Sequence, residues 1–149
     1  MKKTPSRYAS LDYGLARIGL ALSDEQKIIA SPFAIIASEK KLEATADKIA
    51  KELARLQADK EFILERLIIG MPLMMNGTVG LMADEVKQLA QLLKDQLPAC
   101  EIILWDERLS SVQADRSLRE SQMSRRARSK QVDRVAAAII LQSYLDSLA

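Results

Sequence analysis

Four acidic residues of this chain stand where a cation would be needed to hold them together. Asp12 ends an apolar run, Asp106 and Glu107 end a second one, and Asp133 lies at the start of an amphipathic pattern near the C-terminus. A carboxylate at the end of a buried strand costs desolvation energy unless something pairs with it. Carboxylates that converge on one place also repel each other, so a cation is the simplest compensation.

The ligand chemistry narrows the cation and its use. The chain has no histidine, so the candidate metal ligands Asp12, Asp106, Glu107 and Asp133 offer only oxygen. Oxygen ligands suit Mg²⁺ or Mn²⁺, hard ions that also bind phosphate groups. This combination predicts a metal-dependent enzyme that cleaves phosphodiester bonds.

Composition excludes several other chemistries. Without histidine there is no Ser-His-Asp triad and no histidine-ligated zinc. The single cysteine, Cys100, cannot form an intramolecular disulfide or a cysteine zinc site, and we interpret it as a small apolar filler beside a strand. Aromatic residues make up only 4% of the chain, which leaves little material for a base-stacking platform.

Size and hydropathy indicate one globular domain. The 149 residues fit a single domain, which we assign to 1–149, and 48% of them are hydrophobic. The N-terminal MKKTPSRYAS is not followed by an apolar stretch of the kind found in signal peptides, and no run approaches the ~18 apolar residues of a membrane span. A cytoplasmic location is therefore the expectation.

Hydrophobic periodicity predicts an α/β fold. Strands are expected at 7–13, 18–23, 33–37, 67–69 and 101–105, the first two joined by the turn Gly14–Arg17. Helices are expected from an N-cap at Ser38 to about residue 58, and at 82–97, 110–120 and 131–147, with a basic loop at 121–130. This order predicts a five-stranded mixed sheet with helices on both faces. Ligands of such sheets gather beyond the strand ends, so the acidic residues would meet if the first and last strands were neighbours.

Basic residues cluster beside the acidic ones. The net charge is only +2, but residues 116–130 carry six basic side chains against Glu120 alone, a local charge of +5. Concentrated positive charge next to a metal site suits a nucleic-acid backbone, although a solvated loop is the alternative. The candidate phosphate-contacting residues are Arg17, Arg108, Arg125, Arg126, Arg128 and Lys130.

Each acidic candidate also has a structural interpretation. Asp12 could begin a tight turn, with Gly14 admitting a close backbone approach. Strand alternation points Asp106 and Glu107 to opposite faces, so only one of them is expected to face the metal. We favour Glu107 as the ligand, while Asp106 could cap the next helix or pair with Arg108. Asp133 lines up with one edge of the apolar stripe of its helix, which favours a ligand role, and it would also be a favourable charge in the first helical turn.

Four motifs in order give a family resemblance. They are D-Y-G-x-x-R-I-G-x-A-x-S-D from Asp12, G-M-P-L-x-x-x-G-T from Gly70, W-D-E-R-L-S-S-x-x-A from Trp105, and D-x-x-A-A-x-x-I-L-Q-x-Y-L from Asp133. Together they resemble the YqgF/RuvX-like family across nearly the whole chain. The resemblance implies a ribonuclease H-like fold and either processing of the 5′ end of pre-16S rRNA or resolution of Holliday junctions.

The resemblance also implies roles for the residues. Asp12, Glu107 and Asp133 would be catalytic, with Asp12 bridging two Mg²⁺ or Mn²⁺ ions about 3.5–4 Å apart. Structured RNA is the favoured partner and branched DNA the alternative. A junction resolvase would need a dimer, whereas a processing nuclease can act as a monomer.

Two other classes of protein remain as rivals. The glycine turn after a strand aspartate is also similar to the phosphate loop of the actin and sugar-kinase fold, but that fold uses two such domains. The second rival is a binding module for rRNA or protein that keeps the fold without catalysis.

Overall fold

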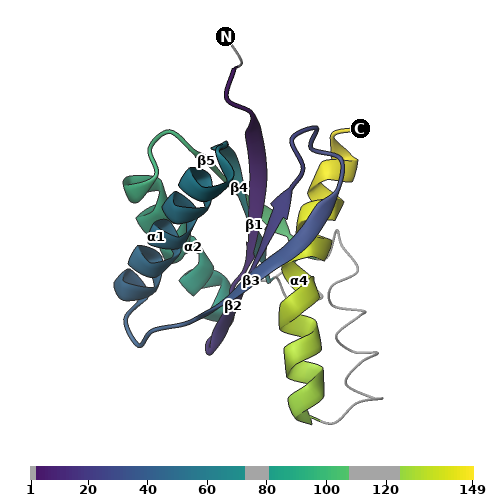
Figure 1. The fold of residues 1–149 in the computed structure, drawn as a ribbon. Coiled ribbons are helices and arrows are strands. Elements are labelled where there is room, and N and C mark those ends of the chain that lie inside the picture. The colour runs from purple at the N-terminus through teal and green to yellow at the C-terminus, as the bar shows by residue number, and fades with distance from the viewer. Residues whose placement is uncertain (1–2, 73–80, 108–124) are drawn as a thin grey trace.

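The computed structural model describes residues 3–72, 81–107 and 125–149, with the side chains of residues 81 and 125–134 left out (Figure 1). Five strands are described: β1 (Ser6–Asp12), β2 (Arg17–Ser23), β3 (Ala30–Ala37), β4 (Ile63–Met71) and β5 (Glu101–Asp106). Three helices are described: α1 (Leu42–Lys60), α2 (Leu81–Gln96) and α4 (Arg125–Ser147). The expected helix at 110–120 lies outside the described residues.

The strands form one mixed sheet in the order β3-β2-β1-β4-β5. β1, β4 and β5 run parallel, while β2 is antiparallel to both β1 and β3. The predicted five-stranded mixed sheet with helices on both faces is therefore confirmed, and Figure 1 shows α1 and α2 on one side and α4 on the other. The first and last strands, however, are not neighbours, because β4 lies between them.

Strand alternation divides the core into two layers. Ala9, Leu11, Leu67 and Ile69 face α1 and α2, and they belong to a buried apolar cluster with residues of both helices. Tyr8 and Ile68 face α4 and pack with Ala137, Ile140 and Tyr144. The buried positions of α1 recur every three or four residues, as an amphipathic helix requires: Ala46, Ile49, Leu53 and Leu56.

The predicted start of α1 at Ser38 is wrong. The helix begins at Leu42, and its N-cap residue Lys41 gives no side-chain hydrogen bond. Ser38 instead donates from Oγ to the carbonyl of Gly14, 2.8 Å away, which ties the end of β3 to the β1–β2 turn. Thr45, one turn into the helix, accepts a hydrogen bond from the backbone of Glu39 at 2.9 Å. The Ser38 hydroxyl, which the local sequence pattern assigned to helix capping, thus makes a tertiary contact instead.

The predicted loop over residues 121–130 is wrong for its second half, because α4 begins at Arg125. Residues 125–130 contain arginine, alanine and lysine, which are good helix formers, and no glycine or proline interrupts them. No described helix is long and apolar enough to span a membrane.

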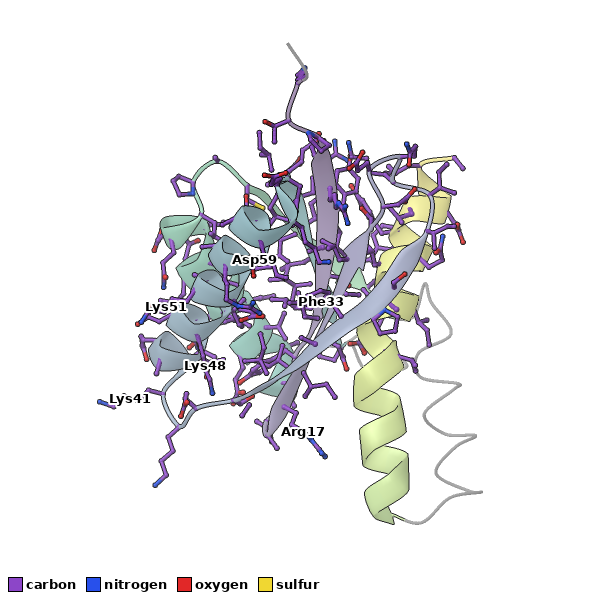
Figure 2. The ribbon with its side chains drawn as sticks, viewed as in Figure 1. Arg17, Phe33, Lys41, Lys48, Lys51 and Asp59 are labelled. Atoms are coloured by element: carbon purple, nitrogen blue, oxygen red, sulfur yellow. The ribbon has the colours of Figure 1, made fainter. Side chains whose placement is uncertain are left out.

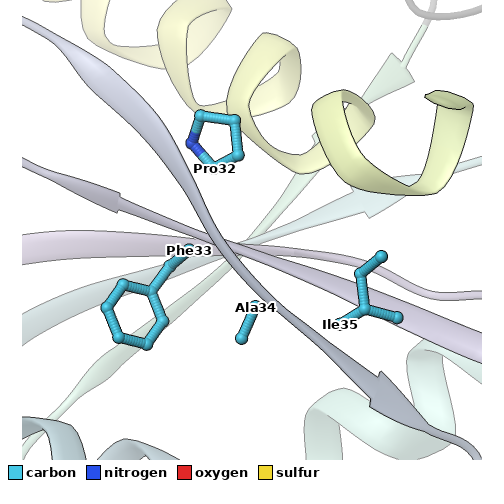
Figure 3. A pocket seen from close by; sticks show the side chains of 4 residues that line it. All are labelled: Pro32, Phe33, Ala34 and Ile35. Carbon is cyan, nitrogen blue, oxygen red and sulfur yellow. The ribbon is translucent and has the colours of Figure 1, made fainter. Parts of the chain in front are cut away.

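The edge strand β3 has an irregularity in its pairing with β2, which makes it less able to pair with a further strand. Leu20 pairs with Ala34 and the next residue, Ala21, pairs with Pro32, so Phe33 is an extra residue. Proline and a bulge on an edge strand both discourage further pairing. A pocket of about 440 Å³ is lined here by Pro32, Phe33, Ala34 and Ile35 (Figure 3). Among the described side chains, neither Asp12 nor Glu107 lines it.

Candidate active site at the end of the parallel strands

Asp12 is the last residue of β1, and it is 4% exposed. Its strand neighbour on the same face, Ser10, donates a hydrogen bond to a carbonyl of α4, so this face of β1 lies under α4. The turn that follows is tight, as predicted. A Cβ at Gly14 would lie 2.6 Å from the carbonyl oxygen of Arg17. Asp12 is therefore both the start of a turn and a buried acid facing the helix.

Gly70 separates the two strands that carry the acidic residues. Leu11 pairs with Ile69 across β1 and β4, so Asp12 and Gly70 follow side by side. On its other edge β4 pairs Gly70 with Trp105 of β5. With about 4.8 Å between neighbouring strands, β1 and β5 are about 10 Å apart. The sequence suggested that the acidic residues would meet if β1 and β5 were neighbouring strands. Because β4 lies between these strands, Asp12 and Glu107 are not brought together in that way.

Glu107 crosses part of that gap, because Gly70 has no side chain. A Cβ built at Gly70 would lie 2.8 Å from Oε1 of Glu107 and 2.6 Å from Cδ1 of Ile140 in α4. Both distances are shorter than normal contacts, so the space above Gly70 is occupied by the glutamate and the isoleucine. Glu107 is 2% exposed and lies on the α4 face, the face that Asp12 shares.

Asp106 belongs to the opposite face. It pairs with Met71, whose side chain packs in the cluster against α1 and α2. Residues directly opposite on paired strands point to the same face, so Asp106 points away from Asp12. The geometry thus places Glu107, and not Asp106, on the side of Asp12, while its role as a metal ligand stays a prediction.

The two buried carboxylates carry an electrostatic cost. Oδ1 of Asp12 and Oε2 of Glu107 are buried atoms that accept no hydrogen bond from the described residues, although both residues make other contacts. Taking a carboxylate out of water is unfavourable unless positive charge or donors surround it. Among the side chains that the structure describes, no three acidic, cysteine or histidine groups lie together as a complete metal site.

The third predicted acid, Asp133, is described only by its backbone. It lies more than two turns inside α4, because the helix begins at Arg125. The alternative of a favourable charge in the first helical turn is therefore wrong. Asp133 is one turn before Ala137, the residue whose carbonyl accepts the hydrogen bond from β1.

Of the basic candidates, only Arg17 has a described side chain. It begins β2 and alternates with Gly19, which pairs with Asp12, so Arg17 belongs to the same face of the sheet. Figure 2 shows it at the end of the sheet where β2 begins. Arg108 lies outside the described residues. Four others are placed in the first part of α4 by their backbone alone: Arg125, Arg126, Arg128 and Lys130.

Three residues that support the site were not singled out for this from the sequence. Gly70 provides the space for Glu107, and Ser10 contacts α4. Tyr13 donates from its hydroxyl to Oε2 of Glu85 in α2 at 2.8 Å, which anchors the residue after Asp12 on the other face. Burial, followed by the hydrogen bond to Glu85, raises the pKa of Tyr13 to about 12. The sequence could have pointed to Ser10, because a serine two residues before an aspartate at the end of a strand lies on the same face as that aspartate.

A ribonuclease H-like sheet with buried acids at the end of its parallel strands defines a class of nucleases. The chain belongs to the RuvX family, whose model is described as Holliday junction resolvase and matches residues 6–147. This is a nuclease family, whose chemistry is hydrolysis of phosphodiester bonds, and it favours that chemistry over an ATP-binding enzyme.

Similar proteins agree with this assignment. A relative from Protochlamydia amoebophila, named "Putative pre-16S rRNA nuclease", is 55% identical over 98% of this chain and 97% of its own. Thermus thermophilus RuvC in complex with a Holliday junction has a TM-score of 0.57 at 10% identity, covering 96% of this chain and 95% of that one. The fowlpox virus Holliday junction resolvase has a TM-score of 0.54 at 16% identity, covering 95% and 99%. At such low identities the two structures show the fold alone.

Proposed function

We propose that this protein is a metal-dependent nuclease that cuts structured RNA, with the 5′ end of pre-16S rRNA as its substrate. One observation carries the catalytic part: Asp12 and Glu107, at the ends of strands that are not neighbours, are both buried on the α4 face, and Glu107 lies over Gly70, the residue beside Asp12 in the sheet. The substrate rests on the name of the Protochlamydia relative, which is more than half identical along nearly the whole chain.

The residues fit a hard divalent cation. The donors are carboxylate oxygens, the ligands that Mg²⁺ and Mn²⁺ prefer, and Gly70 leaves room for one of them. Asp12 and Glu107 would hold the metal together with Asp133 from α4. When bound, such an ion supplies an activated water and stabilises charge on the phosphate oxygens.

The protein contributes position and a water-poor environment. Asp12 and Glu107 are fixed by the ends of two strands and covered by α4, so little reorganisation is needed when charge develops. Arg17, on the same sheet face, would hold a phosphate of the substrate backbone. Contacts of this kind read the backbone and not the bases, so binding would weaken with salt. One strand is cut in this reaction, and a monomer of one domain is sufficient.

A four-way DNA junction is the second candidate substrate, and the description of the matching family model favours it. Resolution needs two symmetric cuts and therefore a dimer. The two substrates differ in a measurable way, since RNA processing does not require a second copy of the active site.

The decisive experiment compares both substrates under the same conditions. End-labelled pre-16S rRNA fragment and a four-way DNA junction are incubated with the protein and Mg²⁺ or Mn²⁺. Asp12→Asn removes the central carboxylate, and Asp59→Asn, an exposed acid on α1 that pairs with Arg55, is the matched control. We expect RNA cleavage that falls on the order of 10²-fold or more in Asp12→Asn and is unchanged in Asp59→Asn.

Each other outcome changes the conclusion. Cleavage of the junction alone, with the same dependence on Asp12, would replace RNA by DNA as the substrate. Cleavage that survives Asp12→Asn would place the chemistry elsewhere. Salt-sensitive binding without cleavage of either substrate would indicate a binding module.

A further inference from the structure

Ser10 is a polar residue in an apolar layer. It is fully buried, and its partners on the neighbouring strands are Ala21 and Ile68, both fully buried as well. Its Oγ donates to the carbonyl oxygen of Ala137 in α4 at 2.6 Å. A backbone carbonyl has two lone pairs, so this oxygen can also accept the ordinary hydrogen bond within the helix. Alanine would therefore leave no helix group unsatisfied, and stability alone gives little reason for a serine here.

At this point of α4, the shape of the side chains does little to fix where the helix sits on the sheet. Ala136 and Ala137 are buried against the sheet, and alanine side chains allow close approach without interdigitating. A hydrogen bond from β1 to one particular helix carbonyl is directional. It is lost if α4 slides by one residue or rotates, and it therefore fixes both the axial and the rotational position of the helix.

The contacts between β1 and α4 run toward the acidic end. Tyr8 contacts Tyr144, with ring centroids 6.1 Å apart, and Ser10 contacts Ala137, so the helix runs backward as the strand runs forward. Two residues further along β1 is Asp12, about 6.6 Å on, and four residues back along α4 is Asp133, about 6 Å on. The hydrogen bond thus connects the residue two positions before Asp12 in β1 with the residue four positions after Asp133 in α4.

We infer that Ser10 is a positioning residue for the metal site, setting the register of α4 on β1 and with it the place of Asp133 along the sheet. The inference rests on the proposed function, because it assigns Asp133 to that site. Ser10 touches neither substrate nor metal and acts through the helix. Outer contacts of this kind typically change metal affinity or activity by 10–100-fold.

The test compares two buried serines of the same sheet. Ser10→Ala removes the contact with α4. Ser23→Ala removes hydrogen bonds with the Tyr8 amide and the Asp24 carbonyl, and neither of these partners belongs to α4. Mn²⁺ alone is titrated into each protein and free Mn²⁺ is followed by electron paramagnetic resonance, with thermal unfolding measured in parallel. We expect about tenfold weaker Mn²⁺ binding in Ser10→Ala and wild-type binding in Ser23→Ala.

A second pair of variants tests whether the effect passes through Asp133. If it does, Ser10→Ala should weaken Mn²⁺ binding in the wild-type background and have no further effect in an Asp133→Asn background. Ser10→Cys keeps a weak donor of similar size, so it should recover part of the affinity and serves as the reporter if Ser10→Ala does not fold.

The outcomes separate this inference from the proposed function. Equal Mn²⁺ affinities in wild type, Ser10→Ala and Ser23→Ala, with binding still dependent on Asp12, would overturn the inference and leave the nuclease proposal standing. Additive effects of Ser10→Ala and Asp133→Asn would overturn it too. Mn²⁺ binding that does not depend on Asp12 would overturn both.

Discussion

The two ends of the layer between the sheet and α4 differ in how their polar side chains are arranged. At one end Arg66 donates to the hydroxyl of Tyr144 at 2.8 Å and pairs with Glu101 at 3.1 Å. The ring of Tyr144 meets those of Tyr8 and Trp105 edge-on, with centroids 6.1 and 5.2 Å apart. At the other end, Asp12 and Glu107 are buried acids beside a glycine.

This difference suggests that, within one layer, the aromatic end contributes mainly to stability and the acidic end mainly to function. The aromatic end joins opposite charges, rings and hydroxyls, and its interactions stabilise the docking of α4. The acidic end buries two carboxylates of like charge and has no side chain at Gly70, and buried carboxylates and missing side chains are both less favourable for stability than a packed apolar layer. Proteins accept such costs where a site must be prepared for a ligand. Variants at the two ends should therefore affect different quantities.

Among variants that keep every acidic residue, Gly70→Ala should have the largest effect, because it closes the acidic end. Its Cβ would meet Oε1 of Glu107 and Cδ1 of Ile140, so we expect at least a tenfold loss of activity and a loss of about 1–3 kcal/mol in the free energy of unfolding. Cleavage rates and urea unfolding measure the two effects.

A second substitution distinguishes two causes of the Gly70→Ala effect, crowding of Glu107 and crowding of Ile140 in α4. Ile140→Val removes Cδ1, the atom nearest to the new methyl group, and leaves Glu107 in place. Gly70→Ala with Ile140→Val should therefore recover stability relative to Gly70→Ala and remain poorly active. Full recovery of activity would show that crowding of α4, and not of Glu107, was responsible.

Tyr144→Phe tests the aromatic end and should have a moderate effect on stability only. It removes the hydroxyl that accepts from Arg66, a partly exposed side chain, so we expect a loss of about 1 kcal/mol in the free energy of unfolding. Cleavage should stay within about twofold of wild type in the same preparations. A large fall in activity at unchanged stability would mean that the aromatic end belongs to the site.

Tyr13 should give the protein a weaker, pH-dependent stabilisation. Its pKa is about 12 in the folded protein against about 10 in the unfolded chain, so the folded state keeps the proton more firmly. The contribution is complete below about pH 10 and is lost as the pH rises through about 12. The stability difference between wild type and Tyr13→Phe, measured by urea unfolding, should shrink over that range. A difference that is constant from neutral pH to pH 12 would contradict the shift.

Cys100 should matter least. Burial, followed by the nearby Glu101 carboxylate, raises the pKa of its thiol to about 11, so the reactive thiolate is scarce at neutral pH. Alkylation by iodoacetamide should be slow in the folded protein and fast in urea, and Cys100→Ala should leave cleavage unchanged. Rapid alkylation of the folded protein at neutral pH would contradict its interpretation as an apolar filler.

Local patterns predicted the elements better than their ends. The buried positions of α1 and the apolar run of β4 follow from hydrophobic spacing, but β4 is longer than predicted, at Ile63–Met71. Ser38 was misassigned because its hydroxyl has two possible uses, and only the position of the β1–β2 turn selects one. The helical start of α4 was missed because a basic, serine-rich segment is equally typical of a loop.

For the candidate site, the sequence by itself predicted the chemistry: no histidine, one cysteine, and acidic residues at the ends of apolar segments favour oxygen ligands and a hard cation. Strand alternation, a property of the sequence, also predicted that only one of Asp106 and Glu107 faces the site. Only the tertiary structure decided that β4 separates the two acidic strands, that Glu107 lies in the space above Gly70, and that Ser10 donates a hydrogen bond to α4. These facts depend on strand order and helix docking, which arise from contacts between residues far apart in the chain.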